Sequence, residues 1–187
     1  EVTCRDWSSD VCSSDLGGSF SSETRPVYDE LDPVDEFRIR RSALRTRAGI
    51  FTGPVGELYA GYSIQRIESY PLFSEEIPEA RIFQGNEGAF FAGFSWDAID
   101  EIDFPRRGGY GSLVYSRAEK WLGGDGYAQK ACGEAHRYFT PVDRHTLGLH
   151  VRGGTSFDSD LDFWNKFFLG GKDTLAGYYE NSFFGNH

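Results

Sequence analysis

Large apolar side chains recur at every second position along several segments of this sequence, and no other feature restricts the fold as strongly. In residues 88–97, Phe90, Ala92, Phe94 and Trp96 share one side of an extended chain, while the residues between them share the other. Six strand candidates of about ten residues each follow one another, of which the fourth and fifth alternate less clearly: residues 37–50, 57–66, 88–97, 109–118, 127–139 and 146–153. The sequence therefore predicts an all-β fold.

The lengths of the strands and of their connections favour a membrane barrel over a soluble β-sandwich. A tilted strand needs about nine to eleven residues to cross a bilayer, whereas globular strands usually have about five or six. The connections at 52–56 and 140–145 are short, and those at 68–87 and 156–187 are long. Short turns on one rim and long loops on the other are typical of bacterial outer-membrane barrels. A soluble sandwich also explains the alternation and is the alternative.

Composition and charge restrict the function further. The chain has 187 residues, 16% aromatic residues, 23 glycines and no methionine, which favours turn-rich β structure over a helical bundle. Its net charge of −10 argues against a general nucleic-acid binder, because such proteins need a basic face for the phosphates. The sequence has no run of about eighteen apolar residues, so we expect no transmembrane helix.

The first residues look unlike a natural protein. Residues 6–16 read DWSSDVCSSDL, which is typical of a translated sequencing adapter fused to a metagenomic reading frame and unlike a signal peptide. We therefore interpret residues 1–16 as artefactual and residues 17–36, which are rich in Ser, Pro and Asp, as a connector. Residues 37–187 are then a partial barrel domain.

The end of the chain carries a motif in two parts, which read FLGG and TLAGY. Its residues are Phe168, Gly170, Gly171, Leu175, Ala176, Gly177 and Tyr178. The motif resembles the long loop of the BamA/TamA outer-membrane barrel superfamily, also called the bacterial surface antigen family. This resemblance implies that the loop folds back into the barrel lumen and that the protein lies in the bacterial outer membrane.

A second motif lies in an expected periplasmic turn. Within the text DFPRRG, Phe104, Pro105 and Gly108 resemble the strand–turn signature of the same superfamily. Residues 144–155 and 185–187 are most similar to the barrels that follow a patatin-like phospholipase domain. The resemblance therefore implies the barrel of such an enzyme, with the catalytic domain elsewhere.

One position departs from the superfamily pattern. Ala176 stands where the superfamily has arginine, so the usual salt bridge in the lumen to acidic strand residues cannot form. Gly177 and Tyr178 match the pattern, consistent with a close backbone approach and an aromatic anchor. The departure argues against an insertase core.

Patterns for catalysis and metal binding are incomplete. A patatin-type lipase needs a Gly-x-Ser-x-Gly elbow, and residues 154–158 lack its closing glycine. His145 and His150 are five positions apart and would point to opposite faces of a strand, which argues against a shared metal. Cys132 is the one cysteine outside residues 1–16 and supports no disulfide framework. The acidic residues within 97–103 lack regular calcium-ligand spacing. We expect no catalytic residue, metal or cofactor in this chain.

These observations predict an incomplete antiparallel transmembrane β-barrel, in the form of an open curved sheet of about six strands with a loop directed into the lumen. The whole barrel would have roughly sixteen strands. Unpaired strand edges are costly in lipid, so we expect that the piece does not insert stably alone. The first predicted strand carries five arginines that could line the lumen or meet lipopolysaccharide phosphates, and we favour a solvated lumen: Arg38, Arg40, Arg41, Arg45 and Arg47.

Two functions follow as hypotheses. The first is a membrane-anchoring or translocation barrel of a patatin-like phospholipase, whose lipid acyl hydrolase domain is absent from this chain. The alternative is a BamA/TamA-type barrel for outer-membrane protein assembly or secretion. The expected partners are outer-membrane lipid and an unfolded or secreted protein client, and nucleic acid is not expected. A Gly-x-Ser-x-Gly domain upstream would favour the first, and several small periplasmic repeat domains would favour the second.

Overall fold

A computed structural model describes residues 14–29, 32–71, 83–157, 161, 165–169 and 183–185. Its main element is a seven-stranded antiparallel sheet whose strands are neighbours in chain order. The strands are β1 (Ser14–Asp29), β2 (Asp32–Phe51), β3 (Gly56–Pro71), β4 (Phe83–Asp97), β5 (Gly108–Ala118), β6 (Ala128–Val142) and β7 (His145–Ser156). A short 3-10 helix, η3 (Lys120–Leu122), lies between β5 and β6. A separate pair joins β8 (Phe167–Leu169) to β9 (Phe183–Gly185).

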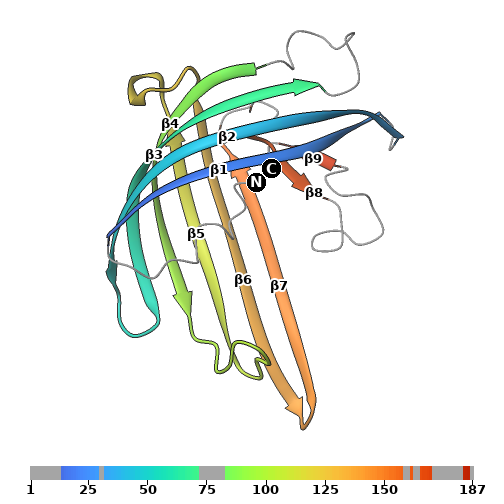
Figure 1. The fold of residues 1–187 in the computed structure, drawn as a ribbon. Helices are drawn as coiled ribbons and strands as arrows, with labels where there is room; N and C mark the ends of the chain where they lie inside the picture. The colour runs from blue at the N-terminus through green and yellow to red at the C-terminus, as the bar shows by residue number, and fades with distance from the viewer. Residues whose placement is uncertain are drawn as a thin grey trace.

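The seven-stranded sheet is open and strongly curved (Figure 1). Its strand order is linear, with β1 and β7 at the two edges, and the described residues contain no pairing between these edges. The predicted fold class, an incomplete antiparallel barrel wall, is therefore confirmed. The wall has seven strands where the sequence predicts about six.

The additional strand comes from the segment predicted to be a connector. That prediction is wrong for residues 17–36, because they form most of β1 and the start of β2. β1 pairs with β2 from Ser14↔Ala48 to Asp29↔Asp32, so residues 14–16 of the adapter-like segment also belong to the strand. The Ser, Pro and Asp residues favour turns locally, but the long β2 strand pairs with this segment along its whole length. Pro26 is tolerated because β1 is an edge strand.

Three connections of the sheet lie at the same end, the lower end in Figure 1. They are residues 52–55 between β2 and β3, residues 98–107 between β4 and β5, and residues 143–144 between β6 and β7. Gly53, Gly108 and Arg144 adopt positive φ values of 100°, 95° and 71° in or beside these turns. Connections at the other end include η3 between β5 and β6. Connections 52–55 and 143–144 are short, as predicted, but β1 and β2 are separated by only two residues at the other end, so short connections are not confined to one rim.

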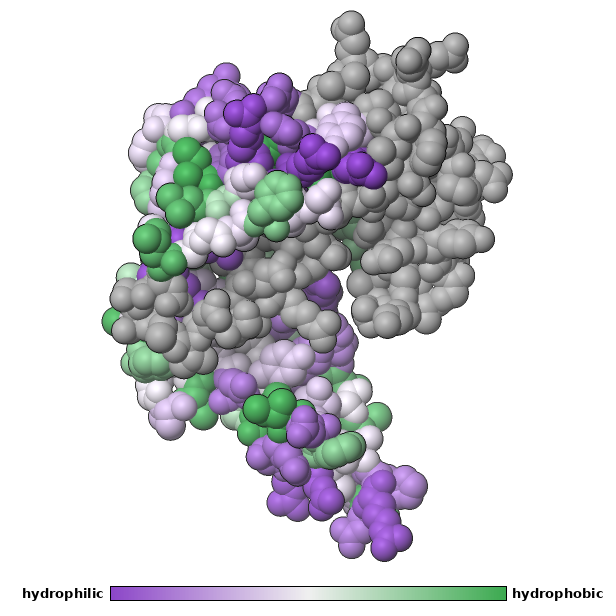
Figure 2. Space-filling model, viewed as in Figure 1, coloured by the Kyte–Doolittle hydropathy of each residue, from purple (hydrophilic) through white to green (hydrophobic). Residues whose placement is uncertain are grey.

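The two faces of the sheet meet different surroundings. On the convex face many large apolar side chains are exposed: Leu44, Ile50, Leu58, Phe90, Phe94, Leu113, Leu147, Leu149 and Val151. Side chains on the concave face converge and are more buried, for example Ile39, Ile67 and Val114. In Figure 2 hydrophilic residues gather at the upper rim and at the tip of the β6–β7 hairpin. This is the pattern of a wall with hydrocarbon outside and water at both ends.

The arginines of β2 divide between these faces. Arg41, Arg45 and Arg47 lie on the concave side with the buried Ile39, whereas Arg38 and Arg40 lie on the convex side. Strand residues of opposite parity point to opposite faces, so a single lumen-facing set of five was not possible. The predicted lumen position is wrong for Arg38 and Arg40.

A small core on the concave face holds the middle strands together. Tyr59, Phe91 and Val114 pack with one another and with the half-buried Cys132. Gly93 lets the Tyr59 ring lie close over β4, because a Cβ at this glycine would stand 2.6 Å from the ring. The Arg47 guanidinium lies 3.9 Å from the centre of the Tyr59 ring on the same face.

Candidate functional site

The concave face carries the start of the long C-terminal segment. Leu161 is 4% exposed and packs with Ala89, Ala118 and Ala128, which belong to β4, β5 and β6. Phe167 packs against the same cluster. The described start of this segment therefore lies inside the curve of the sheet, as predicted for a lumen-directed loop.

Hydrogen bonds fix this segment at Asn165. Lys130 Nζ on β6 donates to Asn165 Oδ1 at 2.8 Å, and Asn165 Nδ2 donates to Glu87 Oε2 on β4 at 2.5 Å. Asn165 is 9% exposed, so a buried amide joins two strands that are not neighbours. Sequence reasoning did not select these three residues, because a single Asn in a loop gives no sign of its distant partners.

Glycine at position 154 allows the closest contact of this segment. A Cβ on Gly154 of β7 would stand 2.3 Å from Phe167 Cε1, so only glycine leaves room for the ring. Phe168, the first residue of the predicted loop motif, is half-buried in β8 and is paired in register with Phe184 of β9. The other motif residues lie outside the described residues: Gly170, Gly171, Leu175, Ala176, Gly177 and Tyr178.

The second predicted motif forms the turn between β4 and β5. Phe104 is 76% exposed, Pro105 is half-buried, and Gly108 begins β5. Gly108 has a φ of 95°, and a Cβ there would stand 1.9 Å from the carbonyl oxygen of Ala98. The exposed ring and the obligatory glycine give this motif a structural basis.

Asp100 organises the same turn. Its Oδ1 accepts hydrogen bonds from the backbone N–H groups of Glu101, Arg106 and Arg107 at 3.1, 3.0 and 3.1 Å. These donors, with that of Arg107 first, lower the pKa of the Asp100 carboxyl below its ordinary value, against a smaller opposing effect of desolvation. In the acidic turn predicted from the sequence, the carboxylate of Asp100 therefore accepts hydrogen bonds from the backbone of the turn itself.

An ion pair lies on the concave face of the wall. Arg47 of β2 donates from Nη2 to Glu57 Oε2 of β3, and both side chains are about nine-tenths buried. Arg45 lies near the ring of Phe91, with 5.5 Å between its guanidinium carbon and the ring centre. An arginine–carboxylate pair is thus present in the lumen face although position 176 is alanine.

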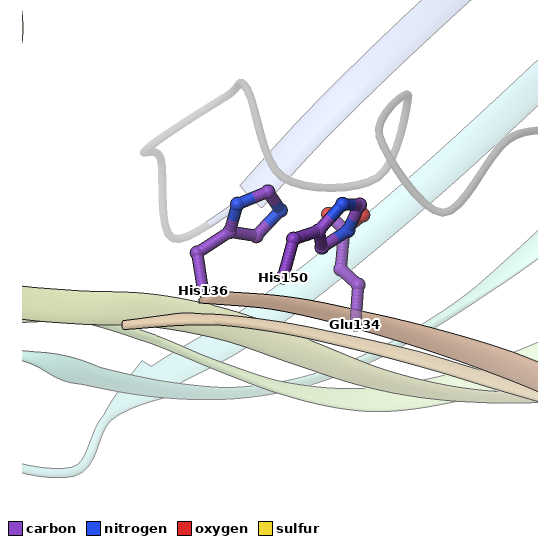
Figure 3. A group of neighbouring side chains, drawn as sticks. All are labelled: Glu134, His136 and His150. Carbon is purple, nitrogen blue, oxygen red and sulfur yellow. The ribbon is translucent and has the colours of Figure 1, made fainter. Parts of the chain in front are cut away.

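A group of possible metal ligands lies further along the concave face (Figure 3). Glu134, His136 and His150 each offer one ligand atom, and these atoms all lie within 4.8 Å of one another. The rings of His136 and His150 stack with centres 3.7 Å apart, and Tyr110 stacks on His136 at 4.1 Å. Two imidazoles and one carboxylate form a donor set that suits first-row transition metals.

Sequence reasoning missed this group because of a bulge in the hairpin. Val142 is opposite His145, and continuing that register would place His150 opposite Arg137. The register shifts by one residue between Phe139 and Val142, so His150 is instead opposite His136. His145, the other histidine considered in the sequence, is not one of these three residues.

The convex face has a shallow hollow of about 650 Å³. Its floor contains Ala48, Ala60 and Ala92, which are aligned across β2, β3 and β4. Tyr62 and Tyr115 are among the larger side chains that border it. The hydrocarbon-facing surface of the wall is therefore indented rather than smooth.

Within the described part of the chain, no helix has the length and apolar character needed to cross a bilayer.

Comparisons with known proteins identify the family of this chain. No curated protein matches the sequence. The sequence profile of the Omp85 superfamily domain, the BamA/TamA type of barrel, matches residues 6–185, nearly the whole chain. Together with the open curved β-sheet, this match shows that the chain belongs to the Omp85 superfamily of bacterial outer-membrane β-barrel proteins.

Proposed function

We propose that this chain is part of the barrel that anchors a patatin-like phospholipase in the outer membrane and offers it a conduit. The observation that carries the proposal is the two-faced wall with the start of the C-terminal segment bound on its concave side. Such a wall holds a protein in lipid through its apolar convex face, while the inner face is free to meet water and chain segments.

Two sequence features support the phospholipase branch. The hairpin at 144–155 resembles the barrels of that branch, and it forms β7 together with the turn before it. Ala176 replaces the arginine of the superfamily motif, which argues against an insertase. The ion pair between Arg47 and Glu57 provides a guanidinium–carboxylate contact within the wall itself.

The alternative is a barrel that assembles or secretes outer-membrane proteins. In such a barrel a lateral seam between strands receives the client, and β1 and β7 are the two edges of the described sheet. An exposed strand edge presents unpaired backbone groups that can pair with a client strand. This feature favours the alternative, but any incomplete wall has it.

The test uses the intact gene from its source. The first step is to read the natural gene upstream of the position of the adapter-like segment, where a Gly-x-Ser-x-Gly domain is expected. The second is to express the intact protein in a bacterial outer membrane and to measure release of fatty acid from phospholipid micelles. Release that depends on the elbow serine supports the proposal. Periplasmic repeat domains and no acyl release would support the alternative, and recovery in the aqueous fraction would contradict both.

A further inference from the structure

The geometry points to a transition-metal site on the concave face of the β6–β7 hairpin, in which Glu134, His136 and His150 bind one Zn²⁺ ion. This site does not depend on the choice between the two functions above. It rests on the cross-strand register, on the burial of the carboxylate and on the chemistry of the three donors.

The register brings the three side chains to one face. Glu134 and His136 are two positions apart on β6, so they point to the same side of the sheet. His150 is directly opposite His136 on β7. Figure 3 shows the three side chains rising from the same face, with the Glu134 carboxylate beside the His150 ring. A pair at i and i+2 with a third residue across the ladder forms a triangle that can bind one ion.

The donor atoms are close to coordination distance. They lie within 4.8 Å of one another. Zinc binds imidazole nitrogen and carboxylate oxygen at about 2.0–2.2 Å, so donors around one tetrahedral ion are about 3.5 Å apart. The nitrogen lone pairs lie in the ring planes, so the stacked rings of His136 and His150 must turn apart to point at one ion. This is a change of side-chain rotamer, and the backbone register can stay as it is.

The carboxylate gives an independent reason for a cation. Glu134 is only 8% exposed. Among the described residues, no hydrogen bond or ion pair engages its carboxylate, although Arg152 is directly opposite in the ladder. A carboxylate on a residue that is mostly buried is stabilised by a nearby cation, and a bound divalent ion would supply that charge. Zn²⁺ is therefore expected to stabilise this hairpin.

The donor set selects among metals. Two nitrogens and one oxygen suit Zn²⁺, and Co²⁺ occupies comparable sites, whereas Mg²⁺ and Ca²⁺ prefer sites built from oxygen alone. Three protein ligands leave a fourth position for water. The bound ion would join β6 to β7 beyond the bulge that sets their register.

The test measures Zn²⁺ binding to the intact protein, purified from outer membranes in detergent and freed of metal with a chelator. Titration calorimetry is expected to give one Zn²⁺ per chain, and Co²⁺ is expected to give the visible absorption of a tetrahedral site. Mg²⁺ is expected to give neither signal.

The matched variants separate a metal site from a ring stack. His150→Phe keeps a stacked ring but has no nitrogen donor, and Glu134→Gln keeps the shape without the charge. Each is expected to weaken Zn²⁺ binding by about tenfold or more, whereas His145→Ala, in the turn end of the same strand, leaves it within about twofold. Correct folding of each variant is checked by the difference in gel mobility between heated and unheated samples. Wild-type protein without Zn²⁺ binding, or a folded His150→Phe protein that binds like wild type, would overturn the assignment.

Discussion

The buried pair between Arg47 and Glu57 gives the sharpest test of how the wall is stabilised. Removing one partner of a buried ion pair leaves a charge without compensation, which typically costs about 3–5 kcal/mol. The side chains of Arg47 and Glu57 are 9% and 11% exposed, so solvent screens the charge weakly. Arg47 keeps its contact with the ring of Tyr59, which places the expected loss near the lower end of that range.

We therefore expect Glu57→Gln to lower the free energy of unfolding by about 3 kcal/mol. The matched control is Glu119→Gln, which removes the pair between Glu119 and Arg117. Those side chains are 21% and 51% exposed, and exposed pairs contribute about 1 kcal/mol or less. Both changes replace a carboxylate paired with an arginine by an amide, and the two pairs differ most in how far they are buried.

The measurement is a urea titration of the intact protein in detergent micelles, followed by tryptophan fluorescence. A double variant, Arg47→Met with Glu57→Leu, removes both charges and is expected to recover most of the lost stability. If Glu57→Gln costs no more than Glu119→Gln, water reaches the pair and the reasoning from burial is refuted.

Three more predictions concern the convex face, the bound segment and the rim turn. Leu113→Arg places a charge on the hydrocarbon side and is expected to cost about 2–4 kcal/mol in bilayer unfolding titrations, whereas Ser116→Arg on the concave side of the same strand costs clearly less. Gly154→Val displaces the ring that packs there and is expected to lower stability by about 1–3 kcal/mol, while Gly153→Val, on the open face, has little effect on the thermal midpoint. Because backbone donors lower the pKa of Asp100, its contribution is present above its ordinary pKa of about 3.9 and is lost as the pH falls through the folded value. Amide exchange in the turn should therefore accelerate in acid in the wild type and be independent of pH in this range, after correction for intrinsic exchange, in Asp100→Asn.

The fold class could be predicted because alternating side chains along a strand face two different surroundings, hydrocarbon on one side and the lumen on the other. Each residue of β4 from Ala89 to Trp96 reports its own face, and no distant partner is needed to interpret it. β1 was missed for the opposite reason. Its Ser, Gly and Pro residues favour turns locally, and only pairing with β2 makes the segment a strand.

The candidate sites depend more on distant contacts. The turn motif with Phe104 and Gly108 was found from the sequence, because a turn depends on residues that are close together in the chain. The contacts of Asn165 join residues that are 35 and 78 positions apart, and no local pattern records them. The pairing of His136 with His150 depends on a single bulge, so a one-residue error in register removes it.

The connections at 52–55, 98–107 and 143–144 lie at one end of the wall and are linked to one another. The backbone N–H of Asp97 donates to Val55 O at 2.8 Å, and Thr140 Oγ1 donates to Arg106 O at 2.8 Å. These bonds tie each turn to the next one along the rim, beyond the ladders of the strands themselves. A force that separates the strands at this end must therefore also break these hydrogen bonds, which link the ends of six strands, β2 to β7.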